Sequence, residues 1–142
     1  MALDLDYSAA LLKAQMDAIT STVGNAALLR IYGGTKPAGP GTTTAETLLA
    51  ELTCGTPFAS GASSAVPSVL TVTDPTTANA AASGTPTWWR IAATGAAAGA
   101  AGFIDGTAGQ SGTAGTDFEM IIGATTSGQP VNVTAFTLTS GT

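Results

Sequence analysis

The segment Thr87-Trp88-Trp89-Arg90-Ile91 holds both tryptophans of the chain and one of its four basic residues. Successive side chains of a β-strand point to opposite faces. A strand here therefore places Trp89 on one face with Thr87 and Ile91, and Trp88 on the other face with Arg90. We expect Trp89 to hold the core together. Trp88 and Arg90 then need a second packed layer, which we expect from a helix of the chain or from another subunit.

The composition indicates one compact domain with few charges. A chain of 142 residues is long enough for one domain with a real core. Hydrophobic residues make up 44% of it and charged residues only 9%, against roughly 25% in an average soluble domain. A monomer with so few charges is poorly protected against association. This shortage predicts a surface that is largely covered by other protein chains.

The sign of the charge excludes two classes of partner. The net charge is −5, with four Lys and Arg residues in all, whereas nucleic-acid binders and proteins of anionic membrane surfaces need a basic patch. No run approaches the roughly 18 apolar residues of a membrane span, and the first residues lack the basic start of a signal peptide. We expect a protein made in a cytoplasm, with no nucleic-acid or membrane partner.

Residues 1–24 are predicted to form an acidic arm and a helix, ahead of a single β domain over residues 25–142. Asp6 or Ser8 can cap a helix from about Ala9 to Val23, and Gly24 is a typical stop. Apolar residues at helical spacing predict one buried stripe, formed by Leu12, Met16, Ile19 and Val23 and widened by Leu11 and Ala18.

The rest of the chain reads as short strands separated by turn signals. The expected strands are 26–32, 46–54 (a strand or a short helical turn), 69–73, 88–94, 101–107, 117–122 and 131–139, with loops at 33–41, 56–66 (anchored by Phe58) and 107–116. This spacing predicts a mainly β fold, an antiparallel sandwich or barrel with one N-terminal α-helix.

One strand pairing can be predicted residue by residue. If residues 95–100 form a hairpin loop, Arg90 and Asp105 are equally far from its centre and lie opposite each other. Such a pair is worth about 0.2–1 kcal/mol when exposed. The guanidinium also lies two residues from Trp88 on the same face, where it can stack on the indole.

The residues of common active sites are scarce. The chain has no histidine, and its one cysteine, Cys54, is expected to be a small buried hydrophobe. Asp117 and Glu119 flank Phe118, an alternation that favours two solvated carboxylates and one core ring over a calcium site. We expect no enzyme, no cofactor and no bound metal.

An ordered set of motifs resembles a known family over roughly residues 26–138. The motifs include Leu29-Arg30-Ile31-Tyr32-Gly33-Gly34-Thr35-Lys36-Pro37, then Gly84-Thr85-Pro86-Thr87-Trp88-Trp89-Arg90-Ile91, then Ile104-Asp105-Gly106-Thr107. Together they are similar to short structural proteins encoded in tailed-bacteriophage genomes and prophages. The resemblance implies a β-rich virion component, found in capsid decoration or in head–tail and tail parts, with an assembly role and no active site.

The expected function is that of a non-enzymatic virion protein, most specifically a capsid decoration or cement protein on the outside of the head. Its partners would be further copies of itself, with a trimer favoured, and the major capsid protein or other virion proteins. The candidate structural or interface residues are Trp88, Trp89, Arg90, Asp105, Tyr32, Leu12, Met16 and Ile19.

Two alternatives stay open. The first is a neck, collar or tail component of the same virion. The second is a secreted glycan-binding or adhesion module that uses Trp88 and Tyr32 as sugar-stacking platforms. The glycan module requires both rings to be exposed on a stable monomer.

Overall fold

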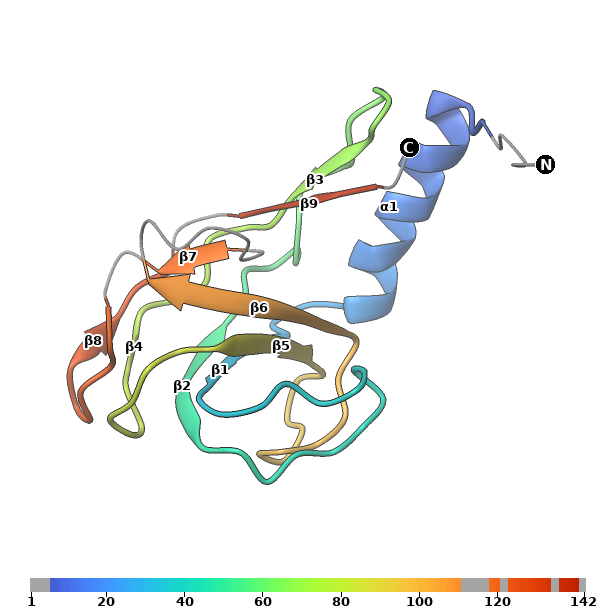
Figure 1. Cartoon of the computed structure of the whole chain (residues 1–142). Coiled ribbons are helices and arrows are strands. Elements are labelled where there is room, and N and C mark those ends of the chain that lie inside the picture. The colour runs from blue at the N-terminus through green and yellow to red at the C-terminus, as the bar shows by residue number, and fades with distance from the viewer. Residues whose placement is uncertain (1–5, 111–117, 121–122, 134–135, 141–142) are drawn as a thin grey trace.

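The computed structural model describes residues 6–110, 118–120, 123–133 and 136–140. Within these residues, one helix is followed by nine short strands (Figure 1). Their bounds are α1 Ala9–Val23, β1 Leu28–Tyr32, β2 Leu48–Thr53, β3 Val69–Thr71, β4 Ala78–Asn79, β5 Trp88–Ala92, β6 Ile104–Gln110, β7 Phe118–Met120, β8 Pro130–Val131 and β9 Thr137–Thr139. The predicted mainly β fold with one N-terminal helix is confirmed.

The strands form one central sheet and two small ribbons. The central sheet has the order β2-β1-β5-β6-β7, and the ribbons pair β3 with β9 and β4 with β8. Every pair is antiparallel except β6 with β7, which is parallel. The sandwich or barrel arrangement stays a prediction.

The helix begins and ends where its caps predict. Ser8 is the N-cap, and its side chain accepts a hydrogen bond from the backbone N–H of Leu11. Gly24 ends the helix at a φ of 76°, a conformation that glycine adopts without strain. Leu12, Met16 and Val23 are buried and Ile19 is partly buried, which confirms the stripe. Its expected widening was wrong, because Leu11 and Ala18 are exposed.

A carboxylate fastens the helix to the loop between β2 and β3. Asp17 forms an ion pair with Lys13 one turn earlier, and its Oδ1 accepts the backbone N–H of Ala62 at 2.7 Å. The hydrogen bond from Lys13, followed by that from Ala62, lowers the pKa of Asp17 below its ordinary value of 3.8. Protonation of Asp17 therefore removes a contact between the helix and the loop.

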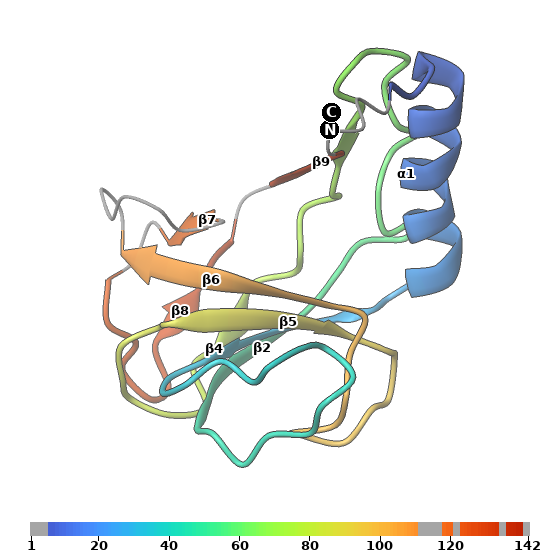
Figure 2. The ribbon, with the colours of Figure 1, turned by 45° about the vertical axis from the view of Figure 1, so that its right-hand side comes forward.

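The core lies on the sheet face that the helix covers. Figure 2 shows α1, β3 and β9 on one side of the sheet and long loops on the other. The buried cluster includes Leu29 and Ile31 of β1, Trp89 and Ile91 of β5, and Phe58. The expected core position of Trp89 and the anchoring role of Phe58 are confirmed.

Trp89 reaches across the next strand because that strand carries a glycine. A Cβ atom on Gly106 would lie only 2.3 Å from the indole of Trp89. The ring crosses β6 at this point and donates its Nε1–H to the carbonyl of Thr107 at 3.1 Å. Because Trp89 lies opposite Gly106 in the register, its side chain can form a hydrogen bond to the neighbouring strand β6.

Three segment predictions needed correction or fall outside the described residues. Residues 107–110 belong to β6, so the loop expected at 107–116 was wrong there. The strand expected over 131–139 is split, since β8 pairs with β4 and β9 pairs with β3. The side chains of Asp117 and Glu119, with the carboxylate pair they would form, lie outside the described part of the chain.

Candidate functional site

A row of four charged side chains crosses the sheet on the face opposite the helix. The strand registers place Arg30 directly opposite Arg90, with Glu51 beside Arg30 on β2 and Asp105 beside Arg90 on β6. We call these four residues the arginine row. Like charges directly opposite each other are destabilising, and a buried charge needs a partner. The carboxylate at each end of the row supplies one.

The Arg90–Asp105 pair is bidentate and fully buried. Arg90 donates from Nε to Asp105 Oδ1 and from Nη2 to Oδ2, both at 2.7 Å. The two side chains are 0% and 1% exposed. The hydrogen bond to Asp105 raises the pKa of Arg90 above its already high ordinary value. The predicted pairing is confirmed, and its burial makes it a far stronger constraint than an exposed pair.

The Arg30–Glu51 pair was missed by the sequence analysis. Arg30 is 1% exposed and donates from Nε to Glu51 Oε2 at 2.7 Å, but the Glu51 side chain is 41% exposed. A signal did exist. Arg30 lies two residues from Tyr32, as Arg90 lies two residues from Trp88, so each arginine shares a face with an aromatic ring.

The remaining guanidinium N–H groups hold two loops against the sheet. The two loops are residues 33–47 and 93–103, and we call them together the loop layer. Both lie below the sheet in Figure 2. Arg30 donates to the carbonyl of Ala97 at 2.7 Å and also to that of Ala96. Arg90 donates to the carbonyls of Thr42 and Ala100 at 2.8 and 2.9 Å. Each loop is thus fixed by backbone acceptors.

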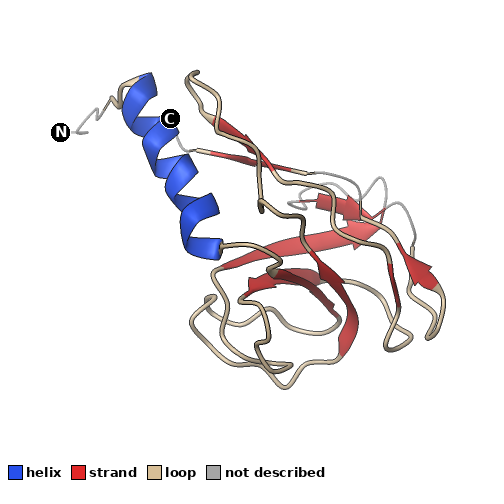
Figure 3. Cartoon of the chain, turned by 180° about the vertical axis from the view of Figure 1, so that it is seen from behind, coloured by secondary structure: helices blue, strands red, loops and turns tan. Residues whose placement is uncertain are grey.

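The two loops are also joined to each other. Thr44 donates its backbone N–H to the carbonyl of Gly99 at 2.8 Å, and Gly102 donates to that of Pro40 at 2.7 Å. Gly99 has a φ of 76°, and a Cβ there would lie 2.2 Å from the carbonyl oxygen of Thr44. The contact therefore requires glycine for both backbone conformation and space. Figure 3, in which loops are tan, shows how much of this side of the chain is irregular.

An aromatic stack fills the layer beside the arginine row. The rings of Tyr32 and Trp88 stack with centroids 4.3 Å apart at an interplanar angle of 10°, and the guanidinium of Arg90 lies 5.2 Å from the Trp88 centroid. Both rings are 0% exposed. The expected source of this layer was wrong, because the chain's own loops supply it and the helix covers the other face. Neither ring is available as a sugar platform.

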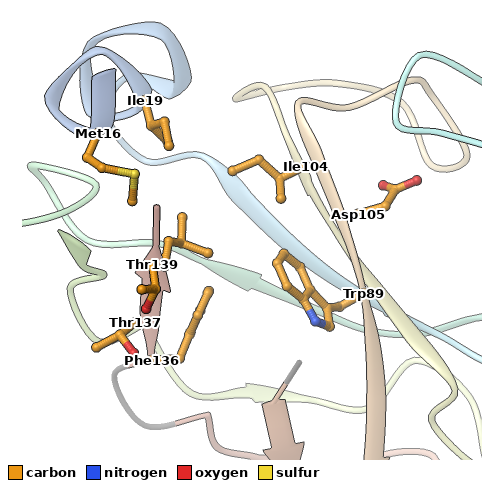
Figure 4. A pocket seen from close by; sticks show the side chains of 9 residues that line it. Met16, Ile19, Trp89, Ile104, Asp105, Phe136, Thr137 and Thr139 are labelled. Carbon is orange, nitrogen blue, oxygen red and sulfur yellow. The ribbon is translucent and has the colours of Figure 1, made fainter. Parts of the chain in front are cut away.

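The helix side of the sheet carries an open apolar groove of about 490 Å³ (Figure 4). Its walls are Met16 and Ile19 of α1, Trp89 and Ile104 of the sheet, and residues 136–139. A smaller hollow of about 220 Å³ continues along Ile19 and Ile104 to Phe103, which is 38% exposed. Apolar surface of this kind, open to solvent, is typical of a binding site.

The structure divides seven of the eight predicted residues between the two faces. Tyr32, Trp88, Arg90 and Asp105 meet under the loop layer, whereas Met16, Ile19 and Trp89 meet at the groove. Leu12 is buried but lies outside the main core cluster. Besides Arg30 and Glu51, the groove wall formed by Phe136 and its neighbours was not predicted from the sequence.

These residues take part in apolar packing and in buried ion pairs. Among the described residues, no group of three or more His, Cys, Asp or Glu side chains could hold a metal ion. No helix in that part of the chain is long and apolar enough to span a membrane. Cys54 is buried as expected, and desolvation raises its pKa to about 11.

Comparisons of the chain with protein-family models, with curated proteins and with solved structures each found no match.

Proposed function

We propose that this protein is a non-enzymatic structural component of a tailed-bacteriophage virion, most specifically a capsid decoration or cement protein on the outside of the head shell. The family resemblance of its motifs motivates the class. The observation that carries the proposal is the loop layer, an irregular surface held in place by buried arginines. Both arginines donate to carboxylates and to loop carbonyls of the chain itself.

The loop layer has the composition of a surface that another protein can cover. Residues 93–103 contain no charged residue, and residues 33–47 contain only Lys36 and Glu46. The centres of protein interfaces are depleted in charge because desolvating charged groups is unfavourable. A surface that is already ordered also loses little conformational entropy on binding. Weak contacts of this kind are multiplied when many copies bind a symmetric shell.

The alternatives differ in what they require of the molecule. A neck, collar or tail component would use the same surface and differ in copy number. A glycan-binding module would need aromatic platforms other than Tyr32 and Trp88, since both rings are buried.

Quantitative mass spectrometry of purified particles tests the proposal. A decoration protein is expected at a copy number that scales with the area of the capsid, whereas a neck or tail protein matches the low rotational symmetry of that part. Absence of the protein from particles made by a phage or prophage that encodes it would refute a virion role.

A charge placed on the loop layer tests the surface itself. Ala98 is exposed in residues 93–103, and Ala98→Asp should leave the fold intact while reducing binding to particles. Ala81→Asp is the matched control, because Ala81 is also exposed but lies beside β2. Equal particle binding by both variants would exclude the loop layer as the contact surface.

A further inference from the structure

The groove is bordered by the edge of a strand. Four consecutive residues, 136–139, line it. Successive side chains of a strand point to opposite faces, so consecutive residues can all border one groove only where the strand presents its edge. In Figure 4 this segment lies below the helix residues Met16 and Ile19 and to the left of the sheet residue Trp89.

The register of the β3–β9 ribbon shows which backbone groups this edge presents. Val72 donates its N–H to the carbonyl of Phe136, and Ser140 donates to that of Ser68. In an antiparallel ladder, hydrogen-bonded pairs alternate with pairs whose N–H and C=O groups point outward. Thr137 and Thr139, which are opposite Thr71 and Val69 in the register, are therefore outward-pointing positions of β9.

The partner strand of the ribbon supports this assignment. The carbonyls of Val69 and Thr71 in β3 point away from β9. They accept hydrogen bonds from the N–H groups of Ser63 and Ser60 at 2.9 and 3.0 Å, respectively. On the β9 side, no hydrogen bond among the described residues engages the backbone of Thr137 or Thr139. A short strand edge whose outward donors and acceptors are engaged by no other described residue thus lies along an apolar groove.

These features specify the chemistry of an occupant. An extended segment can add to such an edge through main-chain hydrogen bonds, with alternate side chains entering the adjoining pocket. Apolar side chains at every second position would reach Met16, Ile19 and Trp89, and polar ones would share the exposed face of Thr137 and Thr139. The occupant is therefore an extended segment in which apolar and polar residues alternate.

The N-terminal arm of the chain has this pattern. Leu3 and Leu5 alternate with Asp4 and Asp6, so a strand over these residues has one apolar and one acidic face. Residues 6–8 are exposed, and Ser8 is extended, with φ −67° and ψ 149°. The chain thus enters α1 from solvent.

We propose that the groove beside β9 binds the arm of a second copy of this chain, with residues 3–6 added as a strand to the outward edge of Thr137 and Thr139. An arm-to-groove contact joins two different surfaces, so each copy both donates and accepts, and the contacts close into a ring when the rotation allows it. Naming a second copy rests on the proposed assembly role, whereas the strand edge and groove do not.

Cross-linking between differently marked full-length copies tests the exchange. One preparation carries Asp4→Cys and the other Thr139→Cys, two positions that would share the polar face of the added strand. The two are mixed and treated with a short thiol-specific cross-linker, and the native Cys54 is buried. The control mixture replaces Thr139→Cys with Ala81→Cys, an exposed position beside β2. A covalent dimer in the first mixture and none in the control is expected.

The other outcomes overturn the proposal in different ways. If the mixture gives no dimer but a single chain carrying both cysteines links internally, the arm closes on its own groove. If neither links, the arm does not occupy this edge.

Analytical sedimentation without cross-linker gives a second readout of self-association. Leu3→Asp with Leu5→Asp should weaken self-association by about tenfold or more, while Leu11→Asp, at an exposed helix position, should leave it unchanged. Identical sedimentation of all three proteins would contradict the proposal. Since neither assay involves particles, arm exchange can fail while the protein is still found in virions.

Discussion

Replacing Asp105 by asparagine tests the role of the arginine row. The substitution keeps the shape of the side chain and removes its charge, so the guanidinium of Arg90 stays buried without a counter-charge. Both side chains are almost fully inaccessible, at 0% and 1% exposure. Removing one partner of a buried ion pair destabilises a protein by about 3–5 kcal/mol. This is a large part of the roughly 5–15 kcal/mol that keeps a domain folded.

The same chemical change at the other end of the row is the control. Glu51→Gln removes the charge opposite Arg30, but the Glu51 side chain is 41% exposed, and partly solvated pairs contribute about 0–1 kcal/mol. The two variants therefore differ mainly in burial. Equilibrium urea unfolding, followed by the fluorescence of the two tryptophans, measures both free energies on one scale.

We predict that Asp105→Asn lowers the free energy of unfolding several times more than Glu51→Gln, since only Asp105 is fully buried. This prediction is refuted if the two variants lose equal stability, or if Asp105→Asn loses less than about 1 kcal/mol. A change in the slope of the unfolding free energy against urea concentration would show that the substitution has altered the folded or the unfolded state. The midpoints of the two unfolding transitions would then not be enough to give the difference in stability.

Three further predictions concern single residues. Gly106→Ala places a Cβ 2.3 Å from the indole of Trp89 and should destabilise the fold by about 1–3 kcal/mol, as measured by thermal unfolding; an unchanged melting temperature would contradict the close crossing. Cys54, buried and with its pKa raised to about 11, should resist alkylation at pH 8 in the native state and react after unfolding; equal rates would show that the site is open. The pKa of Asp17 is lowered, so its contribution is present above pH 3.8 and is lost as the pH falls through the lowered value. Hydrogen exchange at the Ala62 amide, corrected for the intrinsic pH dependence, should lose protection in that acid range, and Asp17→Asn should show no such transition.

The elements with local signals were predictable from the sequence. Ser8 and Gly24 mark the ends of the helix because capping depends on residues next to each other in the chain. The Arg90–Asp105 register follows from counting outward from one hairpin. Trp89 was placed in the core by the period-two alternation of strands.

The loop layer had no such signal. Its contacts are hydrogen bonds from arginines to the carbonyls of Thr42, Ala97 and Ala100. Every residue type has a carbonyl, so the identity of the acceptor leaves no trace in the sequence. The layer over Trp88 was therefore assigned to a helix or a second subunit when the chain itself supplies it.

The split of the last segment had only a weak signal. Apolar and polar residues alternate over 131–139 with one change of phase, at Ala135-Phe136, and β8 pairs with β4 while β9 pairs with β3. Strand partners far apart in sequence are chosen by tertiary packing, which local pattern does not report. The groove, whose wall depends on the position of β9, could not be predicted for the same reason.

Hydrogen exchange in the loop layer of the dilute, isolated protein tests the central claim most directly. The claim is that the chain alone orders this surface, through its buried arginines, before any partner binds. The amides of Thr44 and Gly102, which join the two loops, should be protected in the free protein and should lose protection in Asp105→Asn. Fast exchange of both amides in the free protein, with protection appearing only in an assembly, would contradict the account.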